Sequence, residues 1–276
     1  MEKAYVSREA LSATDKEDLK RVAVALADAA REAILPLFRS TNLALENKAD
    51  QGFDPVTHAD KAAERAMRAI LEAQRPEDGI LGEEYGETFG SSGLTWVLDP
   101  IDGTRSFMSG TPTWGVLIAL RDAAGPFFGV IDQPYIGERF IGGLGLNTMA
   151  GPLGAAALQT RSTRALKDAL LFSTFPEIGS RAEHASFQAV AKEVKLVRYG
   201  LDCYAYALLA AGQIDLVIEA GLSAYDVQAP IAVIEAAGGV VCNWQGRPAH
   251  DGGQIIAAAT PELMAAALPL LQNARL

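Results

Sequence analysis

The segment that most constrains this chain is a short apolar strand that runs directly into two acids. Residues 95–98 read Thr-Trp-Val-Leu, and Asp99-Pro100-Ile101-Asp102-Gly103-Thr104 follows without a break. A surface turn has no reason to place two acids, a rigid proline and a glycine at the end of such a strand. Pro100 stiffens the turn, and Gly103 lets the backbone approach a ligand closely. We therefore expect a buried strand whose C-terminal end presents carboxylates for a function.

Two further acidic clusters point to a metal site. Gly82-Glu83-Glu84 ends a short predicted strand, and Tyr225-Asp226 precedes a predicted helix. Carboxylate oxygens suit hard cations such as Mg²⁺, and two carboxylates in one turn can share a metal pair about 3.5–4 Å apart. Residues 103–107 are expected to open a short helix whose first N–H groups bind an anion. A metal pair beside an anion site is an arrangement for hydrolysing a phosphate ester.

A covalent phosphatase mechanism is the rival interpretation of the acid pair. Haloacid-dehalogenase-type enzymes use an Asp-x-Asp pair in which the first Asp is the nucleophile. In this chain two residues separate Asp99 from Asp102, and Gly-Glu-Glu precedes them. The spacing favours metal ligation by both carboxylates.

The hydrophobic pattern of the first half predicts helices on a mostly antiparallel sheet. Thr14 and Glu17 form a predicted capping box, and apolar residues recur at helical spacing from Leu19 to Leu37. Residues 43–57 are polar and carry Gly52 and Pro55, so they are expected to form a loop, with an extended hairpin as an alternative. The other expected elements are a helix at 59–74, strands at 79–82 and 95–98, and a strand meander at 115–120, 127–132 and 138–142.

After residue 150 strands and helices alternate, which predicts an α/β layer. The expected strands are 170–174, 196–198, 215–219, 240–243 and 254–258, and the expected helices are 181–193, 202–211, 226–237 and one that opens at Thr260 and Pro261. We expect two domains: residues 1–150 with the metal motif, and residues 151–276 with the substrate-side residues and Asp226.

Charge and cysteine content exclude several classes of protein. The net charge is −10 and the isoelectric point is near 4.9, which argues against nucleic-acid binding through a basic face. No apolar run approaches the roughly 20 residues that span a bilayer, and the charged N-terminus does not resemble a signal peptide. The chain has two cysteines, Cys203 and Cys242, whose spacing fits neither a zinc knuckle nor a redox pair. We expect a reduced, cytoplasmic protein.

These motifs together resemble the inositol monophosphatase family. The resemblance rests on the Gly-Glu-Glu segment, the Asp-Pro-Ile-Asp-Gly-Thr segment, Tyr225-Asp226 with the Glu-Ala-Ala-Gly-Gly of residues 235–239, and the Pro-Val-Thr-x-Ala-Asp of residues 55–60. It runs from Lys48 to Asn243. One departure is Tyr225, where the family usually has Trp. The resemblance implies an α/β fold, a layered αβαβα sandwich, a homodimer and two to three Mg²⁺ ions per site.

The resemblance also implies roles for individual residues. Glu83, Asp99 and the Ile101 carbonyl would bind the first metal, and Asp99, Asp102 and Asp226 the second. Glu83 would also help to hold a weaker third metal. Thr104 and Asp60 would orient and deprotonate the attacking water, and the amides of Gly103 and Thr104 would hold the phosphate. Lys48, Asp54 and Thr57 would lie on a mobile segment that closes over the metals.

Within that family the chain is most similar to the histidinol-phosphatases. The similarity lies in residues 104–107, 114–120, 129–134, 138–140 and 199–206, where Asp202 replaces a small residue usual in inositol-specific members. A carboxylate at Asp202, beside Glu219, would pair with the cationic leaving group of histidinol phosphate. Gly200 and Arg198 are further substrate-side candidates. The alternative is that Asp202 caps the helix at 203–211, and both roles can coexist.

The resulting expectation is a Mg²⁺-dependent phosphomonoesterase that converts histidinol phosphate and water to histidinol and phosphate. Inositol-1-monophosphatase is the first alternative, and nucleoside 3′,5′-bisphosphate and sugar bisphosphate phosphatases are the next. The last two would need a basic subsite for a second phosphate, against which Asp202 and Glu219 argue. A non-catalytic regulator that binds a phosphorylated ligand is the alternative of a different class.

Overall fold

The computed structural model describes residues 7–40, 45–47 and 55–273 of the chain. Its helices are α1 (Ala13–Ile34), α2 (His58–Gln74), α3 (Thr104–Met108), α4 (Arg181–Ala191), α5 (Cys203–Ala210), α6 (Ala224–Ala236) and α7 (Pro261–Asn273), with short 3₁₀ turns at Arg8–Ala10 and Leu166–Asp168. Within those ranges no helix is long and apolar enough to cross a membrane.

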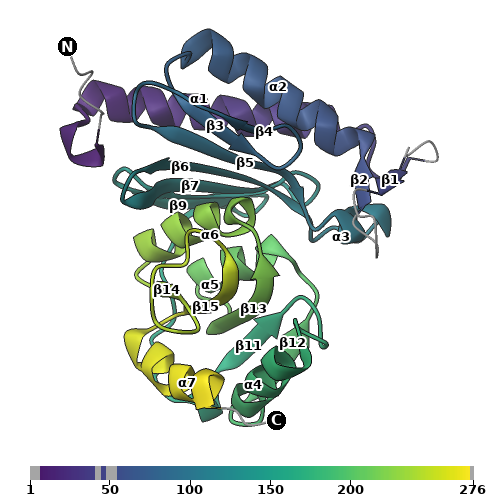
Figure 1. Ribbon diagram of the computed structural model, residues 1–276, viewed down its shortest axis with the longest axis vertical. Coiled ribbons are helices and arrows are strands. Elements are labelled where there is room, and N and C mark those ends of the chain that lie inside the picture. The colour runs from purple at the N-terminus through teal and green to yellow at the C-terminus, as the bar shows by residue number, and fades with distance from the viewer. Residues whose placement is uncertain (1–6, 41–44, 48–54, 274–276) are drawn as a thin grey trace.

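An eight-stranded sheet forms the upper part of the molecule (Figure 1). Its strands, in spatial order, are β10 (Gly154–Ala157), β9 (Leu146–Gly151), β8 (Glu138–Gly143), β7 (Gly125–Gln133), β6 (Gly115–Asp122), β5 (Thr95–Asp102), β3 (Gly79–Gly82) and β4 (Gly86–Thr88). The pairing of β3 with β5 is parallel, and the other neighbours are antiparallel. A separate short ribbon pairs β1 (Leu45–Asn47) with β2 (Pro55–Thr57).

A five-stranded sheet forms the lower part, in the order β12 (Leu196–Tyr199), β11 (Leu170–Ser173), β13 (Leu216–Leu222), β15 (Gly253–Ala258) and β14 (Val240–Asn243). β11 is parallel to both of its neighbours, whereas β15 is antiparallel to both of its own. The first sheet ends at Ala157 and the second begins at Leu170.

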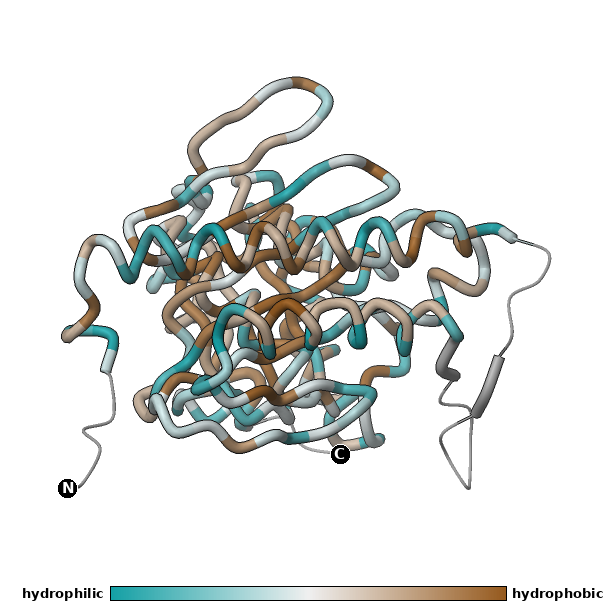
Figure 2. Tube along the Cα trace, turned by 90° about the horizontal axis from the view of Figure 1, so that it is seen from above, coloured by the Kyte–Doolittle hydropathy of each residue, from teal (hydrophilic) through white to brown (hydrophobic). Residues whose placement is uncertain are grey.

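The helices and sheets stack in five layers, which confirms the αβαβα arrangement. Helices α1 and α2 cover one face of the large sheet, α5 and α6 lie between the two sheets, and α4 and α7 cover the outer face of the small sheet (Figure 1). Seen from above, brown and teal residues alternate along α1 and α2, as expected for helices with one face on a core (Figure 2). Helix α6 is buried along most of its length because a sheet lies on each side.

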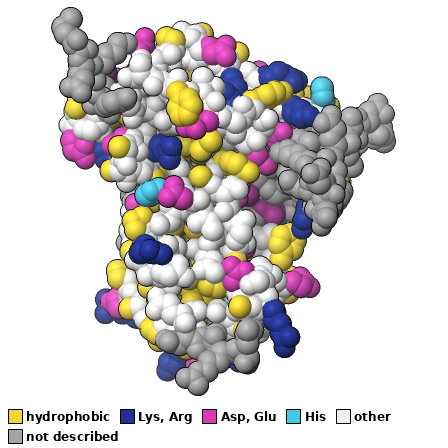
Figure 3. Space-filling view, in the orientation of Figure 1, with side chains coloured by type: hydrophobic (Ala, Val, Ile, Leu, Met, Phe, Trp, Pro, Cys, Tyr) yellow, Lys and Arg dark blue, Asp and Glu magenta, His cyan; other side chains and the backbone are white. Residues whose placement is uncertain are grey.

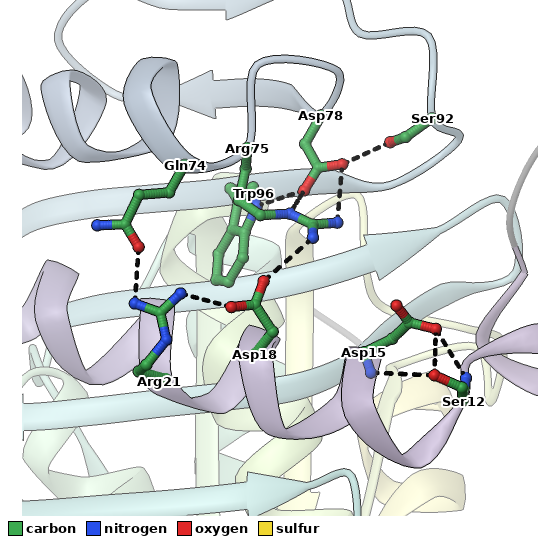
Figure 4. Close-up of polar contacts among 9 residues, drawn as sticks. All are labelled: Ser12, Asp15, Asp18, Arg21, Gln74, Arg75, Asp78, Ser92 and Trp96. Carbon is green, nitrogen blue, oxygen red and sulfur yellow. Dashed lines mark hydrogen bonds and ion pairs between the residues drawn. The ribbon is translucent and has the colours of Figure 1, made fainter.

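The first helix begins two residues before the predicted start, so the Thr14 cap was wrong. Ser12 occupies the N-cap, its hydroxyl accepts a bond from the Asp15 amide at 3.1 Å, and the Asp15 carboxylate accepts one from the Ser12 amide at 2.9 Å (Figure 4). Both segments offer a hydroxyl residue followed three positions later by an acid. The sequence pattern therefore could not choose between two overlapping capping boxes.

The apolar strand β5 is anchored at its start by a buried carboxylate. Asp78, which is 6% exposed, accepts bonds from the Trp96 indole at 3.0 Å, from Arg75 at 2.8 Å and from Ser92 at 2.6 Å (Figure 4). These bonds satisfy the indole N–H, which would otherwise be buried without a partner. They fix the strand whose opposite end carries Asp99 and Asp102.

Candidate active site

A bulge in β5 places Asp99 and Asp102 on the same side of the sheet. Asp99 pairs with Leu117 and Asp102 with Gly115, so three steps along β5 match two along β6. In a regular strand, residues three apart point to opposite faces, and one inserted residue removes that difference. Pro100 lies inside the bulge, where its missing N–H leaves no ladder bond unmade. The Asp-Pro-Ile-Asp spacing is therefore a device for aiming two carboxylates together.

The third carboxylate of the cluster is Asp226, in the first turn of α6. Its Oδ2 accepts a bond from the Ser223 amide at 2.6 Å, which fixes the side chain at the helix N-terminus. One ligand atom from each of Asp99, Asp102 and Asp226 lies within 4.8 Å of the others. These three residues line a cavity of about 330 Å³ together with Glu83, Ile101, Gly103, Thr104, Gly221, Ser223 and Tyr225. Acidic side chains are visible at the waist of the molecule, on the side where α3 lies (Figure 3).

Burial and mutual repulsion make this cluster a site for a cation. Burial first, and then the nearby Glu83, Asp102 and Asp226 carboxylates, raise the pKa of Asp99 well above its ordinary value. Burial, Asp202 and Asp226 raise the pKa of Asp102 in the same way. Asp99 is 1% exposed, and its Oδ1 has no hydrogen-bond partner among the described residues. A buried carboxylate oxygen without a donor, among other carboxylates, fits a hard divalent ion such as Mg²⁺.

Glu83 reaches the cluster because β3 and β5 are parallel neighbours. Gly82 pairs with Leu98, and the Glu83 amide donates to the Leu98 carbonyl at 3.1 Å, so the two strands end side by side. The segment after β3 is held by Glu64 of α2, a residue that the sequence reasoning missed. The buried Glu64 carboxylate accepts bonds from the amides of Glu84 at 2.7 Å and Tyr85 at 3.2 Å.

Glu64 is also paired with Arg68, whose Nε lies 2.8 Å from its Oε1. A Cβ on Gly82 would lie 2.0 Å from the same Oε1, so the chain needs a glycine there. The signal in the sequence was an acid on the apolar face of a predicted helix, next to Ala63 and Met67. Periodicity alone gave it no partner, because the loop that it binds lies 20 residues further along.

The remaining residues of the predicted metal and water machinery lie around this cavity. Thr104 begins α3, and its hydroxyl donates to the Ile101 carbonyl at 3.2 Å. Asp60 is 1% exposed in the first turn of α2. Thr57 ends β2, and Lys48 and Asp54 lie outside the described residues. The pairing of Thr104 with Asp60, the anion-binding amides and the mobile segment stay predictions.

A second cavity, of about 220 Å³, adjoins the first and shares Asp102, Gly221 and Asp226 with it. Its further lining comes from the small-sheet half and includes Thr174, Phe175, Asp202, Cys203, Tyr206, Glu219, Ala220 and Leu222. Asp202 and Glu219 thus lie in one cavity. Arg198 is exposed on the edge strand β12, and neither Arg198 nor Gly200 lines this cavity.

Glu219 is held at the floor of the second cavity by the end of β11. Its Oε1 accepts bonds from the Thr174 amide at 2.6 Å and the Thr174 hydroxyl at 2.8 Å, and Ser173 lies 3.4 Å from Oε2. Glu219 is 5% exposed. Burial raises the pKa of its carboxyl to about 7 in spite of these bonds. A nearby cation would offset that burial and favour the ionised form.

Asp202 does not cap α5 with its side chain, although it occupies the N-cap position. The first amide of that helix, on Cys203, donates instead to Oδ2 of Asp102 at 2.6 Å. Asp202 Oδ2 accepts a bond from the Ser106 hydroxyl at 2.5 Å, with Thr113 at 3.5 Å. Its backbone has φ 49° and ψ −138°, a strained conformation for a residue other than glycine.

The Asp202 side chain also explains Gly103. Gly103 has φ 84°, and a Cβ on it would lie 2.7 Å from Cγ of Asp202. Asp202 therefore packs directly on the turn between β5 and α3, and joins the two sheet halves at the site. Ser106 and Thr113 were missed as its partners, because 96 and 89 residues separate them from Asp202.

Comparisons with known proteins agree with this geometry. The family model described as "Inositol monophosphatase family" matches residues 15–276. "Bifunctional phosphatase IMPL2, chloroplastic" from Arabidopsis thaliana is 44% identical over 86% of this chain and 67% of its own length. "Histidinol-phosphatase" from Streptomyces coelicolor is 34% identical over 88% of this chain and 93% of its own length.

The fold is shared with a solved inositol monophosphatase. The structure of an inositol monophosphatase from Zymomonas mobilis is 40% identical, covers 95% of this chain and 100% of its own, and superposes with a TM-score of 0.81. Taken with the clustered Asp99, Asp102 and Asp226, these matches identify the chain as a member of the inositol monophosphatase family and a metal-dependent phosphomonoesterase.

Proposed function

We propose that this enzyme hydrolyses histidinol phosphate, releasing histidinol and inorganic phosphate. The observation that carries the proposal is the charge of the second cavity. Asp202 and Glu219 line it, with Asp102 and Asp226 at its junction with the metal cluster, and no Lys or Arg is among its described lining residues. A leaving group that carries an ammonium and an imidazole suits such a lining, because charge-assisted hydrogen bonds are about twice as strong as neutral ones.

The chain's own residues would each take a defined part in the reaction. Glu83, Asp99, Asp102, Asp226 and the Ile101 carbonyl would hold two to three Mg²⁺ ions. Bound Mg²⁺ would supply Lewis-acid stabilisation of the phosphate charge and a lowered pKa for water. Thr104 and Asp60 would orient the attacking water and accept its proton, and the amides of Gly103 and Thr104 would bind the phosphate.

The substrate assignment is supported by relatives as well as by charge. Histidinol-phosphatases from Streptomyces coelicolor and Mycobacterium tuberculosis are 34% and 35% identical to this chain over most of its length. Inositol-1-monophosphatase is the second candidate, favoured by the Zymomonas mobilis structure at 40% identity. A sugar or nucleoside bisphosphatase is disfavoured because the described lining offers no cation for a second phosphate.

A substrate panel tests the proposal. Purified enzyme would be assayed for phosphate release from histidinol phosphate, inositol 1-phosphate, glycerol 2-phosphate, a nucleoside 3′,5′-bisphosphate and fructose 1,6-bisphosphate, with Mg²⁺ and with EDTA. We expect the highest kcat/KM with histidinol phosphate and no turnover in EDTA. A clear preference for inositol 1-phosphate would overturn the substrate assignment. Absence of release from every ester would favour a non-catalytic regulator.

Two variants separate the charge of Asp202 from its hydrogen bond to Ser106. Asp202→Asn removes the charge and keeps an acceptor oxygen for Ser106, whereas Ser106→Ala removes the bond and keeps the charge. We expect Asp202→Asn to lower the ratio of kcat/KM for histidinol phosphate over glycerol 2-phosphate by about tenfold or more. Ser106→Ala should change both substrates together. An equal loss on both substrates in Asp202→Asn would mean that Asp202 only positions the turn at Gly103.

The cellular setting and assembly are part of the same proposal. The homodimer follows from the resemblance, and the reduced, cytoplasmic location follows from the cysteine content. Cys203 and Cys242 are both free thiols, which agrees with a reducing compartment. The Arabidopsis thaliana relative is chloroplastic by name. Light scattering on the eluting protein would give the oligomeric state, and a monomer mass would contradict the dimer.

A further inference from the structure

Tyr206 carries a buried hydroxyl that nothing in the described structure satisfies. The residue lies in the middle of α5 and is 4% exposed. Its phenolic oxygen has no hydrogen-bond partner among the described residues. Buried side-chain polar atoms are nearly always bonded, and leaving one unpaired costs about 1–3 kcal/mol. A bound ligand that forms a hydrogen bond with this hydroxyl would remove that cost.

Tyr206 is part of the lining of the second cavity. Tyr206 lines the 220 Å³ cavity with Glu219, Asp202, Asp102 and Asp226. Burial first, then Glu219, Asp102 and Asp226, raise the pKa of Tyr206 well above its ordinary value. The phenol is therefore protonated at neutral pH, and it can accept one bond while donating another.

A neighbouring tyrosine on the same helix shows what a satisfied hydroxyl looks like. Tyr204 donates to Oε2 of Glu138 at 2.7 Å, and its ring contacts Phe140 edge-on. Tyr204 is not among the residues that line the second cavity. The Tyr204 hydroxyl thus has a structural bond to the large sheet, whereas the Tyr206 hydroxyl has no described partner and belongs to a residue that lines the second cavity.

We propose that the Tyr206 hydroxyl is a specificity-determining contact for the leaving group of the substrate, accepting a hydrogen bond from its amino nitrogen next to Glu219. The inference rests on the proposed function and adds to it the Tyr206 oxygen as the atom that binds the amino nitrogen. An ammonium offers three donors, so it can bond the phenolic oxygen and the Glu219 carboxylate at once. The phenolic proton then points to a cavity carboxylate or water. A single alcohol group has one donor and satisfies one of these acceptors.

A pair of simple esters tests the inference without histidinol phosphate. O-phosphoethanolamine and ethyl phosphate differ in the amino group of the leaving group. The measured quantity is the ratio of their kcat/KM values in the wild type, in Tyr206→Phe and in the matched control Tyr204→Phe. We expect Tyr206→Phe to lower the ratio about ten- to a hundredfold, the range for a lost hydrogen bond to a charged group. The change should appear mainly in KM. Tyr204→Phe should leave the ratio as it is in the wild type.

Thermal unfolding provides a readout that does not depend on activity. Tyr206→Phe keeps the ring and removes an unpaired hydroxyl, so its Tm should equal or exceed that of the wild type. Tyr204→Phe should lower the Tm, because it removes the bond to Glu138. A lowered Tm in Tyr206→Phe with an unchanged ester ratio would overturn the inference and assign the hydroxyl to an internal structural bond. Where Tyr206→Phe does not fold, Tyr206→Met serves as the second variant, since an unbranched side chain adapts to an irregular space.

The outcomes separate this inference from the substrate assignment. If the wild type prefers inositol 1-phosphate to histidinol phosphate, the proposed function fails. The ratio of kcat/KM for the two simple esters still shows whether Tyr206 binds an amino group. If histidinol phosphate is preferred and Tyr206→Phe keeps the wild-type ester ratio, the function stands and the inference is overturned.

Discussion

Glu219 and Asp202 face the same cavity but are held by different partners. Glu219 is bonded by Thr174 of its own sheet half, whereas Asp202 is bonded by Ser106 from the other half. Glu219 can therefore change its charge without loosening the turn at Gly103. Asp202 couples substrate recognition to the position of that turn, because its carboxyl packs on Gly103.

The raised pKa of Glu219 predicts a pH-dependent stability difference. The native pKa is about 7 against an ordinary 4.5, with Asp202 the acid that adds to burial. Between these values the folded protein binds more protons than the unfolded chain, so this group's stabilising contribution is complete below pH 4.5 and is lost as the pH rises through 7. Glu219→Gln has no such loss. Between pH 5 and pH 8, the free energy of unfolding of the variant should rise by up to about 3 kcal/mol relative to that of the wild type.

Urea unfolding at those two pH values measures the effect. The wild type and Glu219→Gln should differ more at pH 8 than at pH 5, with the variant gaining on the wild type. A difference that does not move with pH would mean that Glu219 is ionised in the folded protein throughout the range. Addition of histidinol phosphate analogues without the phosphate, such as histidinol, should shrink the difference by stabilising the charged Glu219.

Glu64 predicts a metal-affinity effect from a residue outside the metal cavity. Glu64→Ala would remove the acceptor of the Glu84 and Tyr85 amides and leave Arg68 without its carboxylate. The segment that carries Glu83 would then lose its fixed position. We expect about tenfold weaker Mg²⁺ activation, the range seen when partners of metal ligands are removed. The free energy of unfolding should also fall by about 3–5 kcal/mol, because one partner of a buried ion pair is lost.

A matched variant on the same helix controls for the loss of an acid. Glu72 is exposed on α2, so Glu72→Ala should change neither the Mg²⁺ activation constant nor the Tm by much. Titration of activity with Mg²⁺ and thermal unfolding would be run on both variants. Equal Mg²⁺ activation constants for Glu64→Ala and wild type would show that Glu83 holds its place without Glu64.

At the scale of elements, the acid-bearing strand is longer and more irregular than its sequence suggested. The predicted strand at 95–98 continues through the proline to Asp102, because the bulge between Asp99 and Asp102 accommodates Pro100 within the ladder. Gly103 then turns the chain into α3. The motif is thus one continuous element, and its middle is tolerant of proline only because of the bulge.

Gly103→Ala predicts a clash that can be separated from backbone strain. Gly103 has φ 84° and its Cβ would meet Cγ of Asp202 at 2.7 Å, whereas Gly145 has φ 82° and nothing within 4 Å of its Cβ. Both substitutions to alanine carry the strain of a positive φ, about 1–3 kcal/mol. Gly103→Ala alone should also displace Asp202 and lower turnover. Matching Tm and kcat/KM losses in the two variants would contradict the role given to Asp202.

Helices and meander strands were predictable because each carries its own periodic signal. The sequence predicted the strands at β6, β7 and β8 and the helices α2, α4, α6 and α7 to within a few residues. It missed the hairpin of β9 and β10, whose residues 154–157 read Gly-Ala-Ala-Ala and show no alternation. Small residues carry no polarity to reveal a strand, so pairing with β9 decides their conformation.

The site shows the same division between local and distant information. The clustering of the three acids was predictable, since Asp99 and Asp102 belong to one motif and Asp226 to another. The partners of Asp202 and of the segment after Glu83 were not predictable. Glu64 binds the Glu84 and Tyr85 amides, and Ser106 and Thr113 lie far from Asp202 in the sequence. No spacing rule along the chain encodes such contacts.

For the whole molecule, the negative charges that matter most within the net charge of −10 are those that folding brings close together. Asp99, Asp102 and Asp226 come from the large sheet and from α6, so folding itself forces their repulsion. Folding without a cation is therefore opposed at the junction of the two halves. A divalent ion inverts the local charge and lets an acidic protein bind an anionic ester.

Mg²⁺ should therefore stabilise the entire fold, not only the site. At a free concentration of one hundred times its dissociation constant, an ion that binds the folded state alone contributes about 2.7 kcal/mol, which corresponds to a Tm rise of roughly 5–10 °C for a chain of this size. Asp99→Asn replaces the Asp99 carboxyl, whose pKa is raised by burial and by its acidic neighbours, with a neutral amide. The metal-free variant should melt above the metal-free wild type, and Mg²⁺ should shift its Tm little. Calorimetry would compare the wild type and Asp99→Asn, each in EDTA and in Mg²⁺. A metal-free Tm that is lower in Asp99→Asn than in the wild type would show that repulsion among these carboxylates does not destabilise the metal-free fold.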